Sequence, residues 1–259
     1  MMALRVSRRV ILIFVHVLAG LLLTPLILTR HEGRLRTHPG VTSWWHNRLA
    51  DILDLSITVS GYRPHRPALM VSNHVSWLDI VVLGGLTQTD FLSKYEVRRW
   101  PLIGWLAARS GTLFIRRGNN EAGAISEQIA AKLSGNGILT IFPEGTTSDG
   151  REVRPFFSRL FAAAIDTNTD VIPVALRYHI DGDHDHIAPY TGDQSLAENM
   201  RGLITREKTE VNVVFGEPIR LSGHTRKEIA TLARDAIIEL LGGPEQIPMG
   251  QRARTAASG

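Results

Sequence analysis

A histidine and an aspartate five positions apart form the pair with the clearest chemical potential in this sequence. His74 follows the apolar segment 68–72, and Asp79 comes five residues later. On one continuous helix, at about 100° per residue, the two side chains would point roughly 140° apart. They can meet only if the chain turns between them, with a strand ending near Asn73 and a helix beginning near Ser76. Asp79 could then hydrogen-bond one imidazole nitrogen and leave the other free as a general base.

The same residues have a second interpretation that involves no catalysis. The segment Ser76-Trp77-Leu78-Asp79 also matches a capping box, in which Asp79 accepts hydrogen bonds from backbone N–H groups at the start of a helix. Both interpretations need a helix that begins near Ser76. This segment alone therefore leaves a general base and a structural cap open.

A second polar segment follows the apolar strand predicted over 138–142. It contains an acid, a glycine and a hydroxyl residue in succession, Glu144, Gly145 and Thr146. Its backbone N–H groups and hydroxyls could bind an oxyanion or a phosphate, and Glu144 could hydrogen-bond the hydroxyl of an acceptor. The alternative is a polar turn with Gly145 at positive φ and Thr146 as a helix cap.

Two further segments end or form strands. Arg116 and Arg117 close an apolar stretch, and alternation places only one of them on a given face of the strand. One could therefore bind an anion in a cleft while its neighbour faces solvent, although either could simply be a solvated surface residue. The apolar segment 171–176 is predicted to be a core strand, in which Pro173 marks a sheet edge or a strand start.

Short apolar runs alternate with amphipathic stretches from residue 57 onward, a pattern typical of βα units. The predicted strands are 57–60, 68–72, 91–94, 112–116, 138–142, 171–177 and 211–215. The predicted helices are 77–86, 102–109, 121–133, 157–167, 196–205 and 225–241. Strands this apolar need cover on both faces. We therefore expect an α/β fold with a mostly parallel or mixed central sheet flanked by helices.

The N-terminus carries a separate apolar run, Val10–Leu28, which follows three arginines. Nineteen helical residues span roughly 28 Å, which is borderline for a bilayer core of about 30 Å. An in-plane or re-entrant anchor fits the run as well as a span does. A signal peptide is a further alternative, but no small-x-small cleavage site follows. A second apolar segment, 44–55, begins with two tryptophans suited to a membrane interface. We therefore predict membrane-anchoring helices over 1–60, a catalytic domain over 61–241 and a disordered tail over 242–259.

Composition narrows the class of protein. The sequence has 259 residues and no cysteine, so disulfides, thiolate metal sites and a cysteine nucleophile are excluded. Its formal net charge of +4 is spread along the chain, which does not indicate a nucleic-acid partner but suits an anionic membrane surface or anionic substrates. Arginine outnumbers lysine 25 to 4, a bias common in GC-rich bacteria. We expect a bacterial inner-membrane protein whose catalytic domain faces the cytoplasm.

The polar segments taken together closely resemble the signature blocks of the lysophosphatidic acid acyltransferase family. These blocks are, in order, Asn73–Asp79, Phe114–Arg117, Phe142–Thr146 and Val171–Val174. Lys94, Glu96, Pro101 and Gly104 resemble a further family segment between the first two blocks. The similarity covers about residues 61–241. Four blocks in the family's order make a strong signal where any single block would be weak.

The resemblance implies roles for particular residues. His74 would be the catalytic base and Asp79 its orienting acid. The implied acceptor-binding residues are Arg117, which would clamp a phosphate, together with Glu144, Gly145 and Thr146. One position departs from the family: members that act on lysophosphatidic acid often have arginine where this chain has Thr147. The missing cationic contact leaves the acceptor open.

The implied reaction moves a fatty acyl group from a thioester of acyl carrier protein or coenzyme A onto the sn-2 hydroxyl of lysophosphatidic acid, which yields phosphatidic acid. It requires no metal and no redox cofactor. Because of Thr147, the alternative acceptor is a phosphate-free lysolipid such as lyso-ornithine lipid.

Two rivals come from other classes of protein. A metal-dependent hydrolase could use His184 and His186, which lie among three aspartates at 181, 183 and 185. Such a run is more often a solvated loop. A catalytically silent membrane-binding module is the other rival, and the intact pair of His74 and Asp79 argues against it.

Overall fold

The computed structural model describes residues 2–31, 34–62, 64, 66–116 and 121–242. In this part of the chain eight strands form one mixed sheet with the order β3-β10-β8-β4-β7-β5-β6, and β9 pairs with β8. Their bounds are β3 Leu55–Gly61, β4 Ala68–Ser72, β5 Thr89–Lys94, β6 Leu113–Ile115, β7 Ile138–Ile141, β8 Val171–Ile180, β9 Asp183–His184 and β10 Thr209–Phe215. β8 runs antiparallel to β10 and β9, and every other neighbouring pair in this sheet is parallel.

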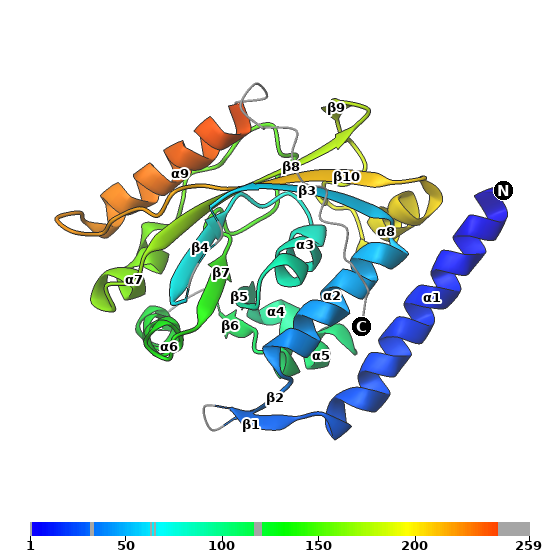
Figure 1. The fold of residues 1–259 in the computed structure, drawn as a ribbon, viewed down its shortest axis with the longest axis horizontal. Coiled ribbons are helices and arrows are strands. Elements are labelled where there is room, and N and C mark those ends of the chain that lie inside the picture. The colour runs from blue at the N-terminus through cyan, green and yellow to red at the C-terminus, as the bar shows by residue number, and fades with distance from the viewer. Residues whose placement is uncertain (1, 32–33, 63, 65, 117–120, 243–259) are drawn as a thin grey trace.

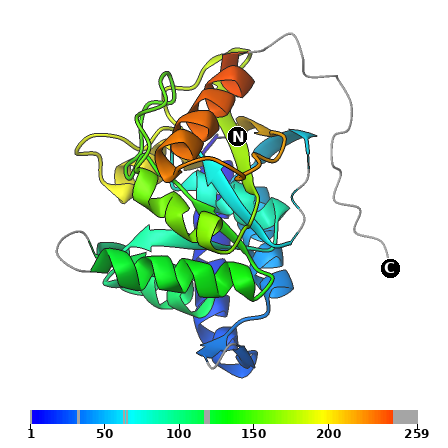
Figure 2. The ribbon, with the colours of Figure 1, turned by 90° about the vertical axis from the view of Figure 1, so that its left-hand side faces the viewer.

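Helices cover both faces of the sheet (Figure 1). One face carries α1 Met2–Leu23, α2 Pro39–Ile52, α3 Leu78–Leu86 and α8 Leu196–Thr205, and the other carries α6 Glu121–Ser134, α7 Ala162–Asp166 and α9 Arg226–Gly242. Figure 2 shows α9, α7 and α6 on the side toward the viewer and the blue N-terminal segments behind them. The alternation of β4 follows these layers, because Met70 packs in one core cluster and Leu69 and Val71 pack in the other.

Smaller elements complete the fold. They are η1 Thr24–Leu26, the hairpin of β1 Thr29–His31 and β2 Arg34–Arg36, α4 Tyr95–Arg98, α5 Ile103–Arg109 and η2 Ser158–Phe161. The hairpin, α4 and β9 have no counterpart among the predicted elements. The helix predicted over 157–167 is also interrupted, because it begins as η2 and continues as the short α7. The fold class is otherwise confirmed, an α/β sheet flanked by helices with an apolar N-terminal helix.

The prediction that Pro173 marks a sheet edge or a strand start is wrong. Pro173 is the third residue of β8, which lies between β10 and β4 in the middle of the sheet. The ladder between β8 and β10 ends at Val174, which pairs with Phe215. The carbonyl of Pro173 still accepts a hydrogen bond from the N–H of Gly216 at 2.8 Å. A missing N–H is tolerated here because it lies on the side where β10 has already ended.

The N-terminal helix is fastened to the domain through one buried arginine. Arg9 is fully buried, and its guanidinium donates to the carboxylate of Asp54 and to three carbonyls at the end of α8. These are the carbonyl of Ile204 in the last turn and those of Arg206 and Glu207 just beyond it. Those carbonyls form the negative end of a helix, where a cation is favourable. Among the described helices, α1 with its following turn is the one long and apolar enough to cross a membrane.

The second apolar segment of the N-terminus belongs to the body of the protein. It forms the last part of α2, which packs along α3, and then the start of β3. β3 pairs in parallel with β10 over all seven of its residues. The sheet therefore includes residues on both sides of the boundary predicted at residue 60, and this division into domains stays a prediction. The tail predicted over 242–259 lies outside the described residues except for Gly242.

Candidate active site

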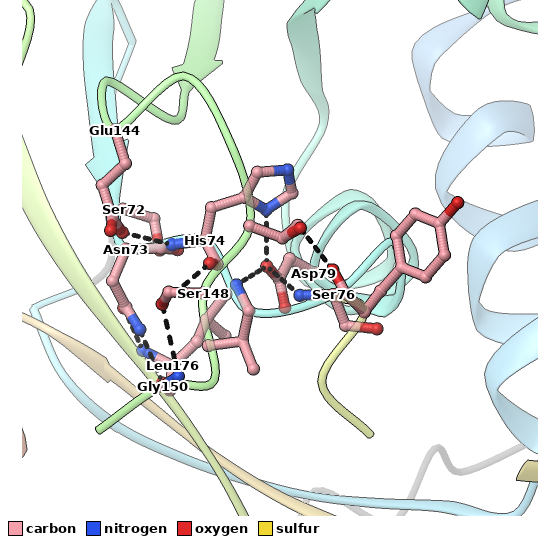
Figure 3. Close-up of polar contacts among 12 residues, drawn as sticks. Ser72, Asn73, His74, Ser76, Asp79, Glu144, Ser148, Gly150 and Leu176 are labelled. Atoms are coloured by element: carbon pink, nitrogen blue, oxygen red, sulfur yellow. Dashed lines mark hydrogen bonds and ion pairs between the residues drawn. The ribbon is translucent and has the colours of Figure 1, made fainter. Parts of the chain in front are cut away.

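The His74 and Asp79 side chains meet where the sequence analysis places them. β4 ends at Ser72, the chain turns through the segment 73–77, and α3 begins at Leu78 with Asp79 in its first turn. His74 Nδ1 lies 2.8 Å from Asp79 Oδ2. Because a carboxylate can only accept, this contact assigns the proton of a neutral imidazole to Nδ1 and its lone pair to Nε2. Figure 3 shows this second ring nitrogen pointing away from Asp79.

Asp79 accepts backbone hydrogen bonds just before the helix and also contacts the histidine. The reciprocal capping box is not formed, because the Ser76 hydroxyl has no hydrogen-bond partner among the described residues. Oδ2 accepts from the backbone N–H groups of Val75 at 2.8 Å and Ser76 at 3.0 Å. Oδ1 accepts from the phenol of Tyr178 at 2.8 Å. Burial, and next the charge of Asp79, hold the pKa of Tyr178 well above its ordinary value of 10.0, so this phenol stays a donor. Four donors thus hold a carboxylate that is fully buried.

Glu144 lies beside His74 because their strands are parallel neighbours. β4 and β7 pair in register, so the loops that follow them leave the same edge of the sheet. Glu144 Oε1 accepts from the N–H of His74 at 2.8 Å, and Oε2 accepts from the N–H of Arg154 at 3.0 Å. Burial raises the pKa of Glu144, while its two backbone donors lower it by less. In this structure Glu144 holds the backbone of the loop that carries His74, whereas the resemblance implies acceptor binding.

The loop after Glu144 also holds the histidine segment. The N–H of Gly145 donates to the carbonyl of Phe142 at 3.0 Å, and Gly145 has the predicted positive φ, at +69°. The N–H of Ser148 donates to the carbonyl of His74 at 2.8 Å. Thr146 is half-buried and lies between these two anchors. Its predicted alternative role as a helix cap is wrong, because the next described helical turn begins only at Ser158.

Aromatic packing fixes the plane of the imidazole ring. The ring of Phe142 stacks on His74 with a centroid distance of 4.0 Å and an interplanar angle of 15°. Phe91 lies parallel to Phe142 at 6.4 Å. The side-chain amide of Asn73 exchanges two hydrogen bonds with the backbone of Leu176, at 2.8 and 2.9 Å, and so extends the pairing of β4 with β8. The histidine is therefore held at its ring face, its Nδ1 atom and its backbone.

The predicted phosphate clamp, Arg117, lies outside the described residues. The preceding residue, Arg116, follows the last residue of β6 and places its guanidinium 3.9 Å from the ring centroid of Tyr95. β6 runs parallel to β5, and β5 to β7, so the chain leaves β6 at the same edge of the sheet as His74. The strand order separates β6 from β4 by two intervening strands.

The residues that a metal-dependent hydrolase would use as ligands make other contacts in this structure. Asp185 is buried, accepts from the guanidinium of Arg206 at 2.6 Å and receives the N–H groups of Ile187 and Ala188. The rings of His184 and His186 lie edge to face with centroids 5.2 Å apart. In the part of the chain that the structure describes, no three His, Asp or Glu side chains are arranged to hold a metal ion.

Three positioning residues were missed by the sequence analysis. Tyr178, Phe142 and Asn73 touch the pair directly or hold its loop. Asn73 and Phe142 lie within the motifs, and their positions at strand ends were a usable signal. Tyr178 is 99 residues from Asp79, and only the adjacency of β8 and β4 brings the two together.

This arrangement can perform one kind of step well. An imidazole with one nitrogen fixed to a buried carboxylate and the other free can remove a proton from a hydroxyl, and the carboxylate stabilises the resulting imidazolium. The side chain of His74 is 18% exposed, so the free edge of its ring can be reached.

Comparison with known proteins identifies the family. The sequence model of the family described as Acyltransferase matches residues 55–177, which include the pair and Glu144. Over 197 residues the chain is 45% identical to a protein of Pseudomonas aeruginosa named lyso-ornithine lipid O-acyltransferase, and the match covers 76% of each chain. The chain belongs to the acyltransferase family.

A second sequence relative and one solved structure carry a different name. A protein of Neisseria meningitidis named 1-acyl-sn-glycerol-3-phosphate acyltransferase is 31% identical over 166 residues, which are 63% of this chain and 65% of that protein. The crystal structure of PlsC from Thermotoga maritima, described as a 1-acyl-sn-glycerophosphate acyltransferase, matches with a TM-score of 0.64 at 20% identity. That match covers 93% of this chain and 96% of PlsC, and it shows the fold. The chain is thus an acyltransferase of lysolipids, and the lysolipid itself is open.

Proposed function

We propose that this acyltransferase transfers a fatty acyl group to the hydroxyl of a lyso-ornithine lipid, with His74 as the general base. The observation that carries the proposal is the 45% identity to a lyso-ornithine lipid O-acyltransferase, against 31% to a relative named for lysophosphatidic acid. The sequence analysis ranked these two acceptors in the opposite order. The comparisons therefore favour the acceptor that it named as the alternative.

The residue at position 147 supports the same acceptor. Thr147 stands where family members that act on lysophosphatidic acid often have arginine, and its hydroxyl donates to the carbonyl of Tyr190. A threonine in this bond supplies no cation for a phosphate. An ornithine head group carries a carboxylate and an ammonium group but no phosphate, so it does not need that contact.

The chemistry follows from the fixed imidazole. His74 Nε2 takes the proton of the acceptor hydroxyl as its oxygen attacks the carbonyl carbon of an acyl thioester. The new C–O bond forms, the C–S bond breaks, and the imidazolium returns its proton to the departing thiolate. Asp79 stabilises the imidazolium, and such general base catalysis contributes about 10²–10⁴-fold. The histidine thus acts on both substrates, and the carboxylate acts only through the histidine.

The donor and the location complete the proposal. The co-substrate is a thioester of acyl carrier protein or coenzyme A, which delivers a soluble acyl group. The acceptor is a membrane lipid, and the outward face of α1 carries exposed Ile11, Phe14 and Leu18 that suit a bilayer. We place the enzyme on the cytoplasmic face of a bacterial inner membrane.

Side-by-side kinetics test the acceptor. Wild type, Thr147→Arg and Arg117→Ala are assayed with lyso-ornithine lipid and lysophosphatidic acid under identical detergent conditions, with His74→Ala as the inactive control. We expect wild type to favour lyso-ornithine lipid and Thr147→Arg to shift the preference toward lysophosphatidic acid. A charge-assisted contact is worth about 1.5–3 kcal/mol, so the shift in relative kcat/KM should be about one to two decades.

Lysophosphatidic acid is the second candidate, and the arginine at position 117 favours it. If Arg117 clamps a phosphate, Arg117→Ala raises the KM for lysophosphatidic acid much more than the KM for lyso-ornithine lipid. If the wild type acylates lysophosphatidic acid but not lyso-ornithine lipid, lysophosphatidic acid replaces lyso-ornithine lipid as the proposed acceptor. Full turnover by His74→Ala would overturn the mechanism for either acceptor.

A further inference from the structure

The turn between α4 and α5 projects apolar side chains into solvent. All six residues of 98–103 are exposed. Within this segment, which we call the α4–α5 tip, Trp100 is 38%, Leu102 50% and Ile103 44% exposed. It belongs to the stretch whose resemblance to a further family segment was noted in the sequence, and the acyl-transfer chemistry gives it no role.

The tip is held in a tight and strained turn. Leu102 has φ +65° and ψ −60°, and the N–H of Ile103 donates to the carbonyl of Pro101 at 2.7 Å. These values describe a classic γ-turn, which is rare and strained, and a bulky residue seldom adopts positive φ. A Cβ on Gly104 would lie 2.2 Å from the carbonyl oxygen of Arg98, so only glycine allows α5 to fold back this closely on α4. Half of the Leu102 side chain is exposed in this strained turn, so it buries little apolar surface in the isolated chain.

The charges around the tip indicate what covers it. Arg98 and Arg99 are adjacent and exposed at its start, and Glu96 is the nearest acidic residue along the chain. The guanidinium of Arg98 lies 5.4 Å from the ring centroid of Phe114. A tryptophan and two aliphatic residues next to two arginines are complementary to the head-group region of an anionic bilayer.

The tip is also attached to the N-terminal segments that expose apolar residues. At the far end of α5 the N–H of Thr37 donates to the carbonyl of Arg109 at 2.9 Å, and Arg109 donates to the carbonyl of Leu35 in β2. Figure 1 shows α5 beside the hairpin that follows α1. Leu35 is 49% exposed, and Leu26, which ends η1 after α1, is 79% exposed. Exposed apolar surface thus occurs on α1, on the hairpin and at the tip.

We propose that the α4–α5 tip is a second membrane-binding element, which inserts Trp100, Leu102 and Ile103 among the head groups of an anionic bilayer. A domain anchored by α1 alone could still rotate about that helix. A second point of contact at the tip restricts how the domain can tilt relative to the membrane. The inference rests on the proposed function only in taking the acceptor to be a membrane lipid.

Site-specific labelling tests the insertion directly. The sequence has no cysteine, so Ile103→Cys carries a single attachment point for an environment-sensitive fluorophore. The matched control is Ile238→Cys, a residue of α9 that is 40% exposed. Figure 1 shows α9 on the opposite side of the molecule from α4 and α5. With phosphatidylglycerol vesicles we expect a blue shift at position 103 and none at 238. Arg99→Gln should weaken this response by about fivefold, the effect of one cation near an anionic surface.

A second variant separates membrane binding from folding. Leu102→Gly relieves the left-handed backbone and removes the apolar side chain, so the melting temperature should stay constant or rise. The rate on acceptor embedded in anionic vesicles should fall by about tenfold or more, while the rate in detergent micelles stays unchanged. Unchanged micellar activity shows that the proposed acyl transfer stands independently of the tip.

Three results would overturn the inference. The label at 103 could remain in water with vesicles while a label at Phe14→Cys enters lipid. Leu102→Gly could lower activity equally in vesicles and micelles, which would make the turn part of the catalytic domain. The label could also respond to acyl carrier protein without vesicles and ignore vesicles alone, which would make the tip a docking site for the donor.

Discussion

At the scale of single residues, Asp79 performs two tasks that different variants can separate. Asp79→Asn keeps the shape but replaces one oxygen with a donor, so the wrong imidazole tautomer is favoured and kcat should fall about 10⁴-fold. Tyr178→Phe removes only the bond to Oδ1 and leaves Nδ1 of His74 engaged. It should cost about 1.5–3 kcal/mol of unfolding free energy and much less activity. Urea unfolding and kcat are measured on both variants. A larger loss of kcat in Tyr178→Phe than in Asp79→Asn would contradict this prediction.

The raised pKa of Glu144 predicts how the stability of the protein depends on pH. Burial raises the pKa of Glu144 in the folded state above the ordinary value of 4.5. Between pH 4.5 and that raised pKa, the folded state therefore binds more protons than the unfolded state. The free energy of unfolding from this group therefore falls as pH rises through that window. Glu144→Gln lacks this dependence. The stability of wild type minus that of the variant should be largest below pH 4.5 and should decrease above it, in urea unfolding series. A difference that grows with pH would show that Glu144 is stabilised as the anion.

At the scale of elements, one buried carboxylate joins three parts of the fold. Asp90 in β5 lies 2.9 Å from the guanidinium of Arg36 in β2 and 2.5 Å from the ammonium of Lys132 in α6. All three residues are more than nine-tenths buried, at 5, 7 and 8% exposure. The cluster fixes the hairpin and α6 to β5, which pairs directly with β7, the strand that precedes Glu144.

Variants of this cluster should differ sharply in stability. Asp90→Asn leaves two buried cations without a counter-charge and should cost about 3–5 kcal/mol of unfolding free energy. Lys132→Met removes the surplus cation, keeps the pair of Arg36 with Asp90 and should change stability by less than about 1.5 kcal/mol. Chemical denaturation of both variants measures the contrast. Equal losses would mean that the three groups do not act as one charge cluster.

At the scale of the whole molecule, the N-terminal helix presents two different faces. Arg9 is buried against the end of α8, whereas Ile11, Phe14 and Leu18 are exposed at 61, 66 and 41%. Their spacing of three and then four residues places these apolar side chains on one face of the helix. The same helix therefore has one side docked on the domain and one side available to a membrane.

Charges on the outer face should release the protein from membranes without unfolding it. Phe14→Asp with Leu18→Asp should move the protein from the membrane pellet to the supernatant, because apolar area and its membrane affinity are lost together. The melting temperature should change little, since both side chains are exposed. Removing all residues before Gly61 would be a poorer test, because it deletes α2 and β3 up to its last residue and exposes the core. Retention of the double variant in the pellet would assign the anchor to another surface.

The sequence by itself determined the local features of this protein. Period-two and helical patterns located the strands and helices, because side-chain alternation reflects which face is buried. The turn between His74 and Asp79 was deducible, since helical geometry keeps the two apart. Glu144 could be placed beside them in the family's motif order, but its backbone partners could not be foreseen.

Only the tertiary structure decided the contacts that depend on strand order. Tyr178 reaches Asp79 because β8 lies next to β4, and Pro173 sits in the middle of the sheet because β10 ends beside it. Arg9 is buried by the end of α8, almost 200 positions away in the chain. No local pattern encodes these pairings, because hydrophobic periodicity reports whether a face is buried and not which element covers it.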